Sequence, residues 1–342
     1  MPRISDLNSM ERHLEVRVRQ VTGHGLDGDR AQPKVTVASS MGFTMHGPLG
    51  WGPVFTEYMT PVLHAAGYEP LQTFLTLVAT EDGGAFLDIG ANQGYFSLLA
   101  AANARAELSV HAFEPVDYYH SMLAANVAAN DLGGSITTHQ VALGSKRGRQ
   151  PVYMHGPSSS LIPDWLMLHS GKAASEGVAD VEVERLDDIL DPDSVAHPIA
   201  IKLDVEGYER DVIRGGARWF RHPQTACILL EAAHPEVIHR AGDVLAALRA
   251  WGFDCYGLTL VRRMEGPARH DPHLVPYQQA LALNRDQWPD EWLCVQRSHA
   301  KADAILNSIS LYPLFMATRL LAGDRLGALA DELARGTQPG DQ

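Results

Sequence analysis

The sequence predicts an α/β fold built on a doubly wound sheet of mostly parallel strands. Short, almost wholly apolar segments alternate with segments of helical spacing from residue 85 onward, which is typical of strands buried on both faces by helices. A glycine-containing turn joins the first strand to the first helix of this series, within "AFLDIGANQGYFSLLAAA" (85–102). The length also fits, because 342 residues that are 45% hydrophobic suffice for one large domain with extensions.

The segments before residue 85 give weaker signals. The stretch "KVTVAS" (34–39) predicts a short strand, and "GFTMHGPLGWGP" (42–53) predicts turn or loop because it is rich in glycine and proline. Between 56 and 80 the apolar residues follow helical spacing, interrupted by "GYEP" (67–70).

Five strands and four helices then follow in regular alternation. The expected strands lie at 86–89, 108–115, 135–143, 198–204 and 226–231, and the expected helices at 95–102, 118–129, 207–216 and 235–251. Two weaker strands, 253–261 and 292–296, are joined by a long loop without a clear helix. This arrangement favours a hairpin at one edge of the sheet.

We expect three regions along the chain: an N-terminal extension over 1–60 that contributes to the substrate side, a main domain over 61–300, and a helical tail over 301–342. The tail shows helical spacing at Leu326 and Leu329. It is expected to pack on the domain or to form a subunit contact in a homo-oligomer.

Composition and charge exclude several classes of protein. The net charge of −13 argues against nucleic acid or an anionic membrane as the main partner. No run of eighteen apolar residues and no signal-peptide h-region are present, so we expect no membrane span and a cytoplasmic location. Three widely spaced cysteines predict neither a disulfide framework nor a zinc site.

The turn after the first expected strand is a candidate ligand site. In a doubly wound sheet the ligand lies at the carboxyl ends of the strands, and the first strand–helix turn meets it there. The glycines Gly90 and Gly94 are separated by three residues, which departs from the G-x-G-x-x-G of dinucleotide sites, and the lysine of a P-loop is missing. A ligand without a pyrophosphate is therefore expected. Asp88 at the strand end is placed to accept a hydrogen bond from an ammonium group.

The next two strands extend this site. Glu114 ends the second strand, 20 residues after Gly94, where a carboxylate can accept from both ribose hydroxyls. Val141 and Ala142, at the end of the third strand, would flank an adenine with apolar surface. A ligand with an amino-acid end, a ribose and an adenine fits this series, and S-adenosylmethionine is such a molecule. Either the turn or the acid alone could instead be ordinary turn structure.

The motifs "FLDIGANQGYFS", "HAFEPVDYYHSMLAANVAAN", "VALGSKRG", "SSSL", "VERLDDIL" and "IKLDVEGYERDVIRGG" resemble, in that order, the FkbM-type S-adenosylmethionine-dependent methyltransferases. The resemblance is close over 85–234 and looser over 60–297, and DVEG followed by Glu209 is its most specific part. It implies a class I methyltransferase (Rossmann-like) fold with a seven-stranded sheet, one strand antiparallel. It also implies methyl transfer, usually to oxygen, on a natural product or sugar.

Carried over to this sequence, the resemblance implies a set of cofactor-binding residues. These are Asp88, Gly90, Asn92, Gly94 and Glu114, with Tyr68 and Glu69 near the methionine end. Together with the neighbours of these motifs, the expected cofactor site comprises Tyr68, Glu69, Asp88, Gly90, Ala91, Asn92, Gly94, Tyr95, Glu114, Pro115, Val141, Ala142 and Asp204.

Candidate catalytic residues follow the fourth and fifth strands. Asp204 and Glu206 follow "IAIKL", Glu231 ends "ACILLE", and His234 comes shortly after it. They could form a base for an alcohol acceptor or, with Asp204 and Glu231 as ligands, a Mg²⁺ site. The structural alternative is that Asp204 and Glu206 hold the loop before the next helix and that His234 caps the following one.

The long insert 154–177 is a candidate lid, in which Ser158–Ser160 and Trp165 could cover the substrate. The sequence and the resemblance together predict a cytoplasmic O-methyltransferase that acts on a small-molecule hydroxyl. Two alternatives stay open: a nicotinamide-dependent oxidoreductase, which the missing third glycine disfavours, and a non-catalytic module that binds S-adenosylmethionine.

Overall fold

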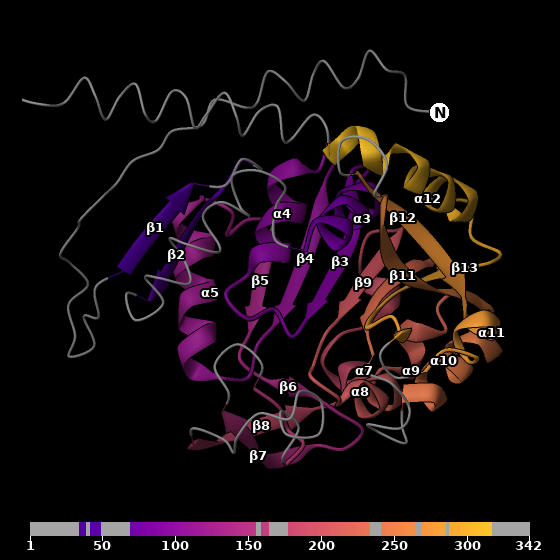
Figure 1. Ribbon diagram of the computed structural model, residues 1–342. Coiled ribbons are helices and arrows are strands. Elements are labelled where there is room, and N and C mark those ends of the chain that lie inside the picture. Colours follow the sequence, from indigo (N-terminus) through magenta and orange to yellow (C-terminus); the bar gives the residue numbers. More distant parts are fainter. Residues whose placement is uncertain are drawn as a thin grey trace, which may run out of the picture.

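The structure is a computed structural model of the chain, shown in Figure 1. It describes residues 34–38, 42–48, 69–154, 159–163, 177–232, 241–263, 269–284 and 287–316. Within them, a central sheet of eight strands carries helices on both faces.

The central sheet has the order β12-β11-β13-β10-β9-β3-β4-β5. Its strands are β3 (Gly84–Ile89), β4 (Leu108–Phe113), β5 (Ile136–His139), β9 (Ile199–Leu203), β10 (Thr225–Glu231), β11 (Phe253–Arg263), β12 (Arg269–Pro276) and β13 (Glu291–Gln296). Strands β5, β4, β3, β9 and β10 run parallel to one another. Strand β13 is antiparallel to both β10 and β11, and β12 is antiparallel to β11.

Two apolar cores lie on the two faces of this sheet, because successive strand residues point to opposite faces. Phe86 packs into the first core and the adjacent Leu87 into the second. The first core holds apolar side chains from α3 (Pro70–Thr80), α4 (Tyr95–Asn103), α5 (Asp117–Ala129) and α12 (Ala302–Ser308). The second holds those of α7 (Leu186–Ile189), α8 (Glu209–Gly215), α9 (Ala217–Phe220), α10 (Ala241–Ala250) and α11 (Tyr277–Ala280).

Two smaller sheets accompany the central one (Figure 1). Strands β1 (Lys34–Ala38) and β2 (Thr44–Pro48) form an antiparallel hairpin, and the amide of Thr44 is tied to the side chain of Asn130 after α5 at 2.7 Å. Strands β6 (Ala142–Leu143), β8 (Gly177–Glu184) and β7 (Gly148–Met154) form a three-stranded sheet. Short 3-10 turns, Pro192–Ser194 and Ile309–Leu311, complete the described elements.

The predicted fold class is confirmed, with three differences in its elements. The sheet has an eighth strand, because the loop expected before 292–296 folds back as β12 against β11. The strand expected over 135–143 divides into β5 and β6, which belong to different sheets. Part of the loop expected at 42–53 forms β2, since cross-strand pairing with β1 outweighs its glycine and proline content.

The edges of the expected domains are described only in part. The start of the tail packs on the domain, where Ile305 and Tyr312 join the first core and the ring of Tyr312 lies edge-on to Phe74. The expected helical positions at 326–333, like most of the N-terminal extension, lie outside the described residues. Among the described residues, no helix is both long and apolar enough to cross a membrane.

Candidate active site

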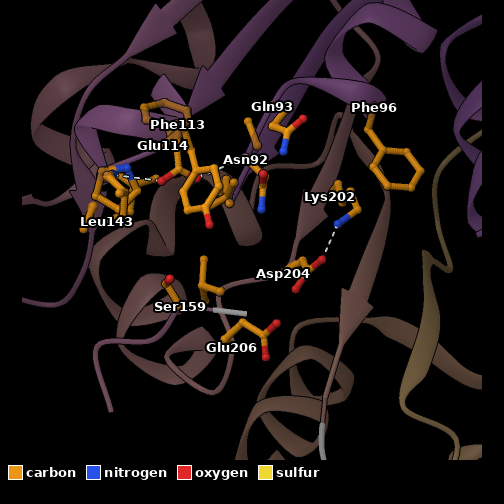
Figure 2. Close-up of a pocket in the computed structure, with 18 of the residues that line it drawn as sticks. Asn92, Gln93, Phe96, Phe113, Glu114, Leu143, Ser159, Lys202, Asp204 and Glu206 are labelled. Carbon is orange, nitrogen blue, oxygen red and sulfur yellow. Dashed lines mark hydrogen bonds and ion pairs between the residues drawn. The ribbon is translucent and has the colours of Figure 1, made fainter. Parts of the chain in front are cut away.

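A cavity of about 410 Å³ opens at the carboxyl ends of β3, β4, β9 and β10, a volume within the usual range for small-ligand sites. Figure 2 shows side chains from these strand ends converging on it. Its lining includes ten of the expected cofactor residues: Glu69, Gly90, Ala91, Asn92, Tyr95, Glu114, Pro115, Val141, Ala142 and Asp204. Tyr68 lies outside the described residues.

The glycine turn between β3 and α4 is a tight backbone structure. Gly90 (φ 87°), Asn92 (φ 51°) and Gly94 (φ 91°) all adopt left-handed conformations, which glycine and asparagine tolerate best. The amides of Gly90 and Ala91 both donate to the carbonyl oxygen of Phe113 at 3.0 and 2.9 Å, so the turn is fastened to the end of β4. Gly94 does not line the cavity; it caps α4, and a Cβ there would lie 2.5 Å from Leu123 Cδ1.

Asp88 lies behind the cavity wall. Its side chain is 1% exposed and is not among the lining residues. Its Oδ2 accepts a hydrogen bond from Ser97 Oγ at 2.6 Å, which ties the end of β3 to α4. Burial raises the pKa of this carboxyl, while Lys202 and the Ser97 hydrogen bond oppose the rise. Asp88 therefore packs against α4 and is not among the residues that line the cavity. The hydrogen bond from a ligand ammonium that the sequence suggested stays a prediction.

Glu114 lines the cavity and is only 6% exposed. Its Oε2 accepts from the amide of Asn92 at 3.0 Å and its Oε1 from the amide of Val116 at 2.8 Å. Burial raises its pKa to about 7, against the lowering effect of these two hydrogen bonds. The carboxyl therefore holds the glycine turn in register with the start of α5, and its remaining lone pairs are available to hydroxyl groups in the cavity.

The side of the cavity beyond Glu114 is apolar. Val141, Ala142 and Leu143 line it together with Phe113 and Tyr119. The ring of Phe113 is stacked on His139, with centroids 4.5 Å apart and planes at 12°. Val141 and Ala142 are thus part of an apolar surface, and their contact with an adenine stays a prediction.

Lys202 is the main residue of the site that the sequence analysis missed. It is the second-to-last residue of β9 and is 2% exposed, and its Nζ contacts Asp204 Oδ2 at 2.7 Å (Figure 2). Its ammonium also lies 4.7 Å from the centroid of the Phe96 ring. Burial lowers its pKa, but the attraction of Asp204, Glu69 and Asp88 outweighs this and the net pKa is raised. The signal was a single cation inside the otherwise apolar "IAIKL".

Three of the four expected catalytic residues line the same cavity. Asp204 follows β9, Glu206 lies two residues on, and Glu231 ends the adjacent β10. The negative charge of Asp204, followed by burial and then by Glu206 and Glu69, raises the pKa of Glu231 well above its ordinary value. This shift favours the protonated, neutral form of the Glu231 carboxyl. His234 lies outside the described residues.

Hydrogen bonds with the side chains of Glu209 and Ser160 fix the loop after Asp204. Glu206 (φ 51°) and Gly207 (φ 95°) are left-handed, and Glu209 Oε1 accepts from the amide of Gly207 at 2.9 Å. On the other side, Ser160 Oγ donates to the carbonyl oxygen of Glu206 at 2.6 Å. Of the insert expected to act as a lid, Ser159 lines the cavity, while Ser158 and Trp165 lie outside the described residues.

The expected Mg²⁺ site finds no support. In the parts of the chain that the structure describes, no three or more histidine, cysteine, aspartate or glutamate side chains are grouped to hold a metal ion. Asp204, one of its two expected ligands, is instead paired with the ammonium of Lys202.

Other residues that the sequence analysis did not single out also line the cavity: Met45, Gln93, Phe96, Phe113, Val116, Tyr119, Leu143, Val152, Leu161 and Val205. Most are apolar residues of strands and helices, which in sequence are indistinguishable from core positions.

The central sheet, its antiparallel β13 beside β10 and the glycine turn at the end of β3 together form a class I, Rossmann-like methyltransferase fold. Residues 88–255 match the family model of the methyltransferase FkbM domain. The chain is also 28% identical over 203 residues to 31-O-demethyl-FK506 methyltransferase FkbM of Streptomyces tacrolimicus. The matched region covers 52% of this chain and 75% of that protein. Both matches support a methyltransferase of the FkbM type.

Solved structures of methyltransferases are similar at low sequence identity. Precorrin-6y C5,15-methyltransferase from Geobacter metallireducens is 14% identical, with a TM-score of 0.35, over 68% of this chain and 91% of that one. An S-adenosylmethionine-dependent O-methyltransferase from Thermotoga maritima is 11% identical, with a TM-score of 0.35, over 67% of this chain and 65% of that one.

Proposed function

We propose that this protein is an O-methyltransferase that transfers the methyl group of S-adenosylmethionine to a hydroxyl of a natural product or sugar. One observation carries the proposal: Asp204 and Glu231, at the carboxyl ends of neighbouring strands, line the same cavity as the glycine turn and Glu114. Carboxyl groups that can accept or donate a proton therefore lie in the same cavity as the groups suited to the cofactor. The acceptor atom is taken as oxygen because the curated relative carries an O-methyltransferase name.

The chemistry of the lining fits the parts of the cofactor in order. The apolar surface of Val141 and Ala142 suits an adenine, and the carboxyl of Glu114 suits ribose hydroxyls. The glycine turn and Glu69 also line the cavity, and they suit the amino-acid end. S-adenosylmethionine supplies an electrophilic methyl group, so the protein's main tasks are to align the acceptor and to exclude water.

Proton transfer from the acceptor is assigned to Asp204. Its Oδ2 contacts Lys202, which holds the carboxylate in one orientation, and Asp204 lines the cavity, so Oδ1 is assigned to the acceptor. When the methyl group passes from the sulfonium sulfur to the acceptor oxygen, the hydroxyl proton passes to this carboxylate and the sulfur is left as a thioether. The raised pKa of Glu231 favours its protonated form, so Glu231 is assigned as a hydrogen-bond donor to the acceptor and not as the base.

The flanking regions are assigned to the substrate side and to packing. Met45, on β2, lines the cavity, which supports a contribution of residues 1–60 to the acceptor site around the 61–300 domain. The 301–342 tail is assigned to packing on the domain, and its contribution to a homo-oligomer stays a prediction.

An acceptor screen tests this proposal. The purified protein is incubated with S-adenosylmethionine labelled in the methyl group and with 31-O-demethyl-FK506, hydroxylated macrolides and sugars. Each acceptor is paired with its amino and deoxy counterparts. We expect label in hydroxyl compounds only, and its loss in Asp204→Asn. Transfer to the amino counterparts would contradict an oxygen acceptor, and cofactor binding without transfer to any acceptor would favour a non-catalytic binding module.

A further inference from the structure

The inner wall of the cavity contains one lysine among several acids. Lys202 is the only cationic side chain among the described residues that line the cavity, whereas Glu69, Glu114, Asp204, Glu206 and Glu231 supply carboxyl groups. A lysine in a strand buried on both faces is costly unless its charge is compensated. The position therefore needs an explanation beyond packing.

The ion pair with Asp204 accounts for only part of the donor capacity of this lysine. An ammonium group has three N–H donors, and among the described residues Lys202 Nζ donates one hydrogen bond, to Asp204 Oδ2 at 2.7 Å. The ring of Phe96 contacts the ammonium as a π-face, at 4.7 Å from its centroid. Because Lys202 also lines the cavity, its remaining donors can serve a bound anion.

The charges of the cofactor complement this wall. S-adenosylmethionine has two cationic groups, the sulfonium and the α-ammonium, and one anionic group, the α-carboxylate. The wall offers carboxyl groups for the cations and one ammonium for the anion. We propose that Lys202 binds the α-carboxylate of S-adenosylmethionine and thereby anchors the methionine end of the cofactor beside Asp204.

The position of Lys202 assigns it to the cofactor and not to an acceptor. Its Cα lies in register with that of Asp88 on β3, directly before the glycine turn. Its ammonium packs on Phe96 in the first turn of α4. Strand β3, the turn and α4 form the side of the cavity that suits the methionine end, whereas Figure 2 draws Glu206 and Ser159 below Asp204, away from Gln93 and Phe96. The inference rests on S-adenosylmethionine as cofactor and not on an oxygen acceptor.

The experiment is a ligand-pair titration that needs no acceptor. Calorimetry measures binding of S-adenosylhomocysteine and of its decarboxylated analogue, which lacks only the α-carboxylate. We expect the wild type to bind S-adenosylhomocysteine about 10- to 100-fold more tightly than the analogue, the range for a charge-assisted hydrogen bond. In Lys202→Met this preference should fall to less than about threefold, with the analogue's affinity nearly unchanged.

Two further variants keep the result interpretable. Lys202→Met leaves buried acids without their counter-charge, so its fold is checked by thermal unfolding. Lys202→Arg retains the charge and should retain most of the preference for the carboxylate. Lys146→Met, the same change at an exposed position outside the cavity, should behave as wild type.

The outcomes separate this inference from the proposed function. A wild type that binds both ligands equally, or a Lys202→Met variant that weakens both by the same factor, would overturn the anchoring role while leaving O-methylation intact. Failure of an acceptor screen would overturn the oxygen acceptor but not the carboxylate preference. A wild type that binds neither ligand would contradict both.

Discussion

Gly90 and Asp204 bring the turn after β3 and the end of β9 into direct backbone contact. A Cβ added to Gly90 would overlap the carbonyl oxygen of Asp204. The amide of Asp204 in turn donates to the carbonyl oxygen of Ile89 at 3.0 Å. The turn assigned to the cofactor and the residue assigned to proton transfer are therefore in direct backbone contact. We expect a change in the backbone conformation of one to displace the other.

Gly90→Ala should disrupt both halves of the site. The new methyl group meets backbone atoms that cannot yield, at a φ of 87° that alanine adopts only under strain. We expect the free energy of unfolding to fall by about 1–3 kcal/mol and the affinity for S-adenosylhomocysteine to fall at least tenfold, measured by denaturant unfolding and calorimetry. Gly133→Ala is the matched control, because nothing lies within 4 Å of a Cβ there. Equal binding by Gly90→Ala and wild type would refute the coupling.

Glu114 should make cofactor binding depend on pH. Burial raises its pKa to about 7, and ribose hydroxyls donate to the carboxylate more strongly than to the carboxylic acid. Ligand binding therefore favours the ionised form, and affinity should rise with pH up to about 7 and then level off. Below that pH it should fall by up to about tenfold per unit.

Glu114→Gln provides the control for this pH dependence. The amide does not titrate, so we expect weaker binding at pH 8 and a flat profile between pH 5.5 and 8, by calorimetry. Adenosine, which has the ribose but no titratable amino-acid end, should show the same wild-type profile as S-adenosylhomocysteine. A profile that persists unchanged in Glu114→Gln would assign the titration to another group.

Asp204→Asn and Glu231→Gln should have unequal effects on turnover. Asn cannot accept the acceptor's proton, so kcat should fall by about 10²- to 10⁴-fold, the usual contribution of a general base. The charge of Asp204 and burial raise the pKa of Glu231 well above its ordinary value, which favours the protonated acid. Its amide analogue should therefore retain kcat within about fivefold. The reverse order of effects, in steady-state assays with an acceptor from the screen, would exchange the two assigned roles.

Glu209 should make the fold itself less stable as pH rises. Burial raises its pKa to about 8 from the model-peptide value of 4.5, against the lowering effect of its backbone hydrogen bonds, including that from Gly207. A folded-state pKa above the unfolded one contributes stability that is complete below pH 4.5 and is lost as pH rises through 8. We expect this group to account for a loss on the order of 4 kcal/mol in the free energy of unfolding between pH 5 and pH 8.5.

Denaturant unfolding of Glu209→Gln at both pH values measures this contribution. The neutral amide resembles the protonated acid, so the variant should lose less stability than wild type over the same interval. Glu182→Gln, at an exposed position of β8, should follow the wild-type curve. If the free energy of unfolding falls equally in Glu209→Gln and wild type, the ionisation of Glu209 does not cause the loss of stability between pH 5 and pH 8.5.

The sequence by itself determined the order of the strands and helices and the identity of the glycine turn. Apolar strand segments and helical spacing are local properties of the chain, so β3 to α5 and β9 to β10 could be predicted from them. The left-handed positions Gly90 and Gly94 were likewise visible as glycines, and Glu114 and Asp204 as acids at strand ends. The family resemblance rested on the same motifs.

Only the tertiary structure decided what those residues face. Asp88 and Lys202 are partners in register on neighbouring strands, yet one is buried behind α4 and the other lines the cavity. The division of 135–143 into β5 and β6, and the pairing of β12 with β11, depended on hydrogen bonds between segments distant in sequence. The raised pKa of Glu231 depended on Asp204, which follows another strand. Burial, strand register and charge proximity arise when separate segments meet, and a local pattern carries no record of them.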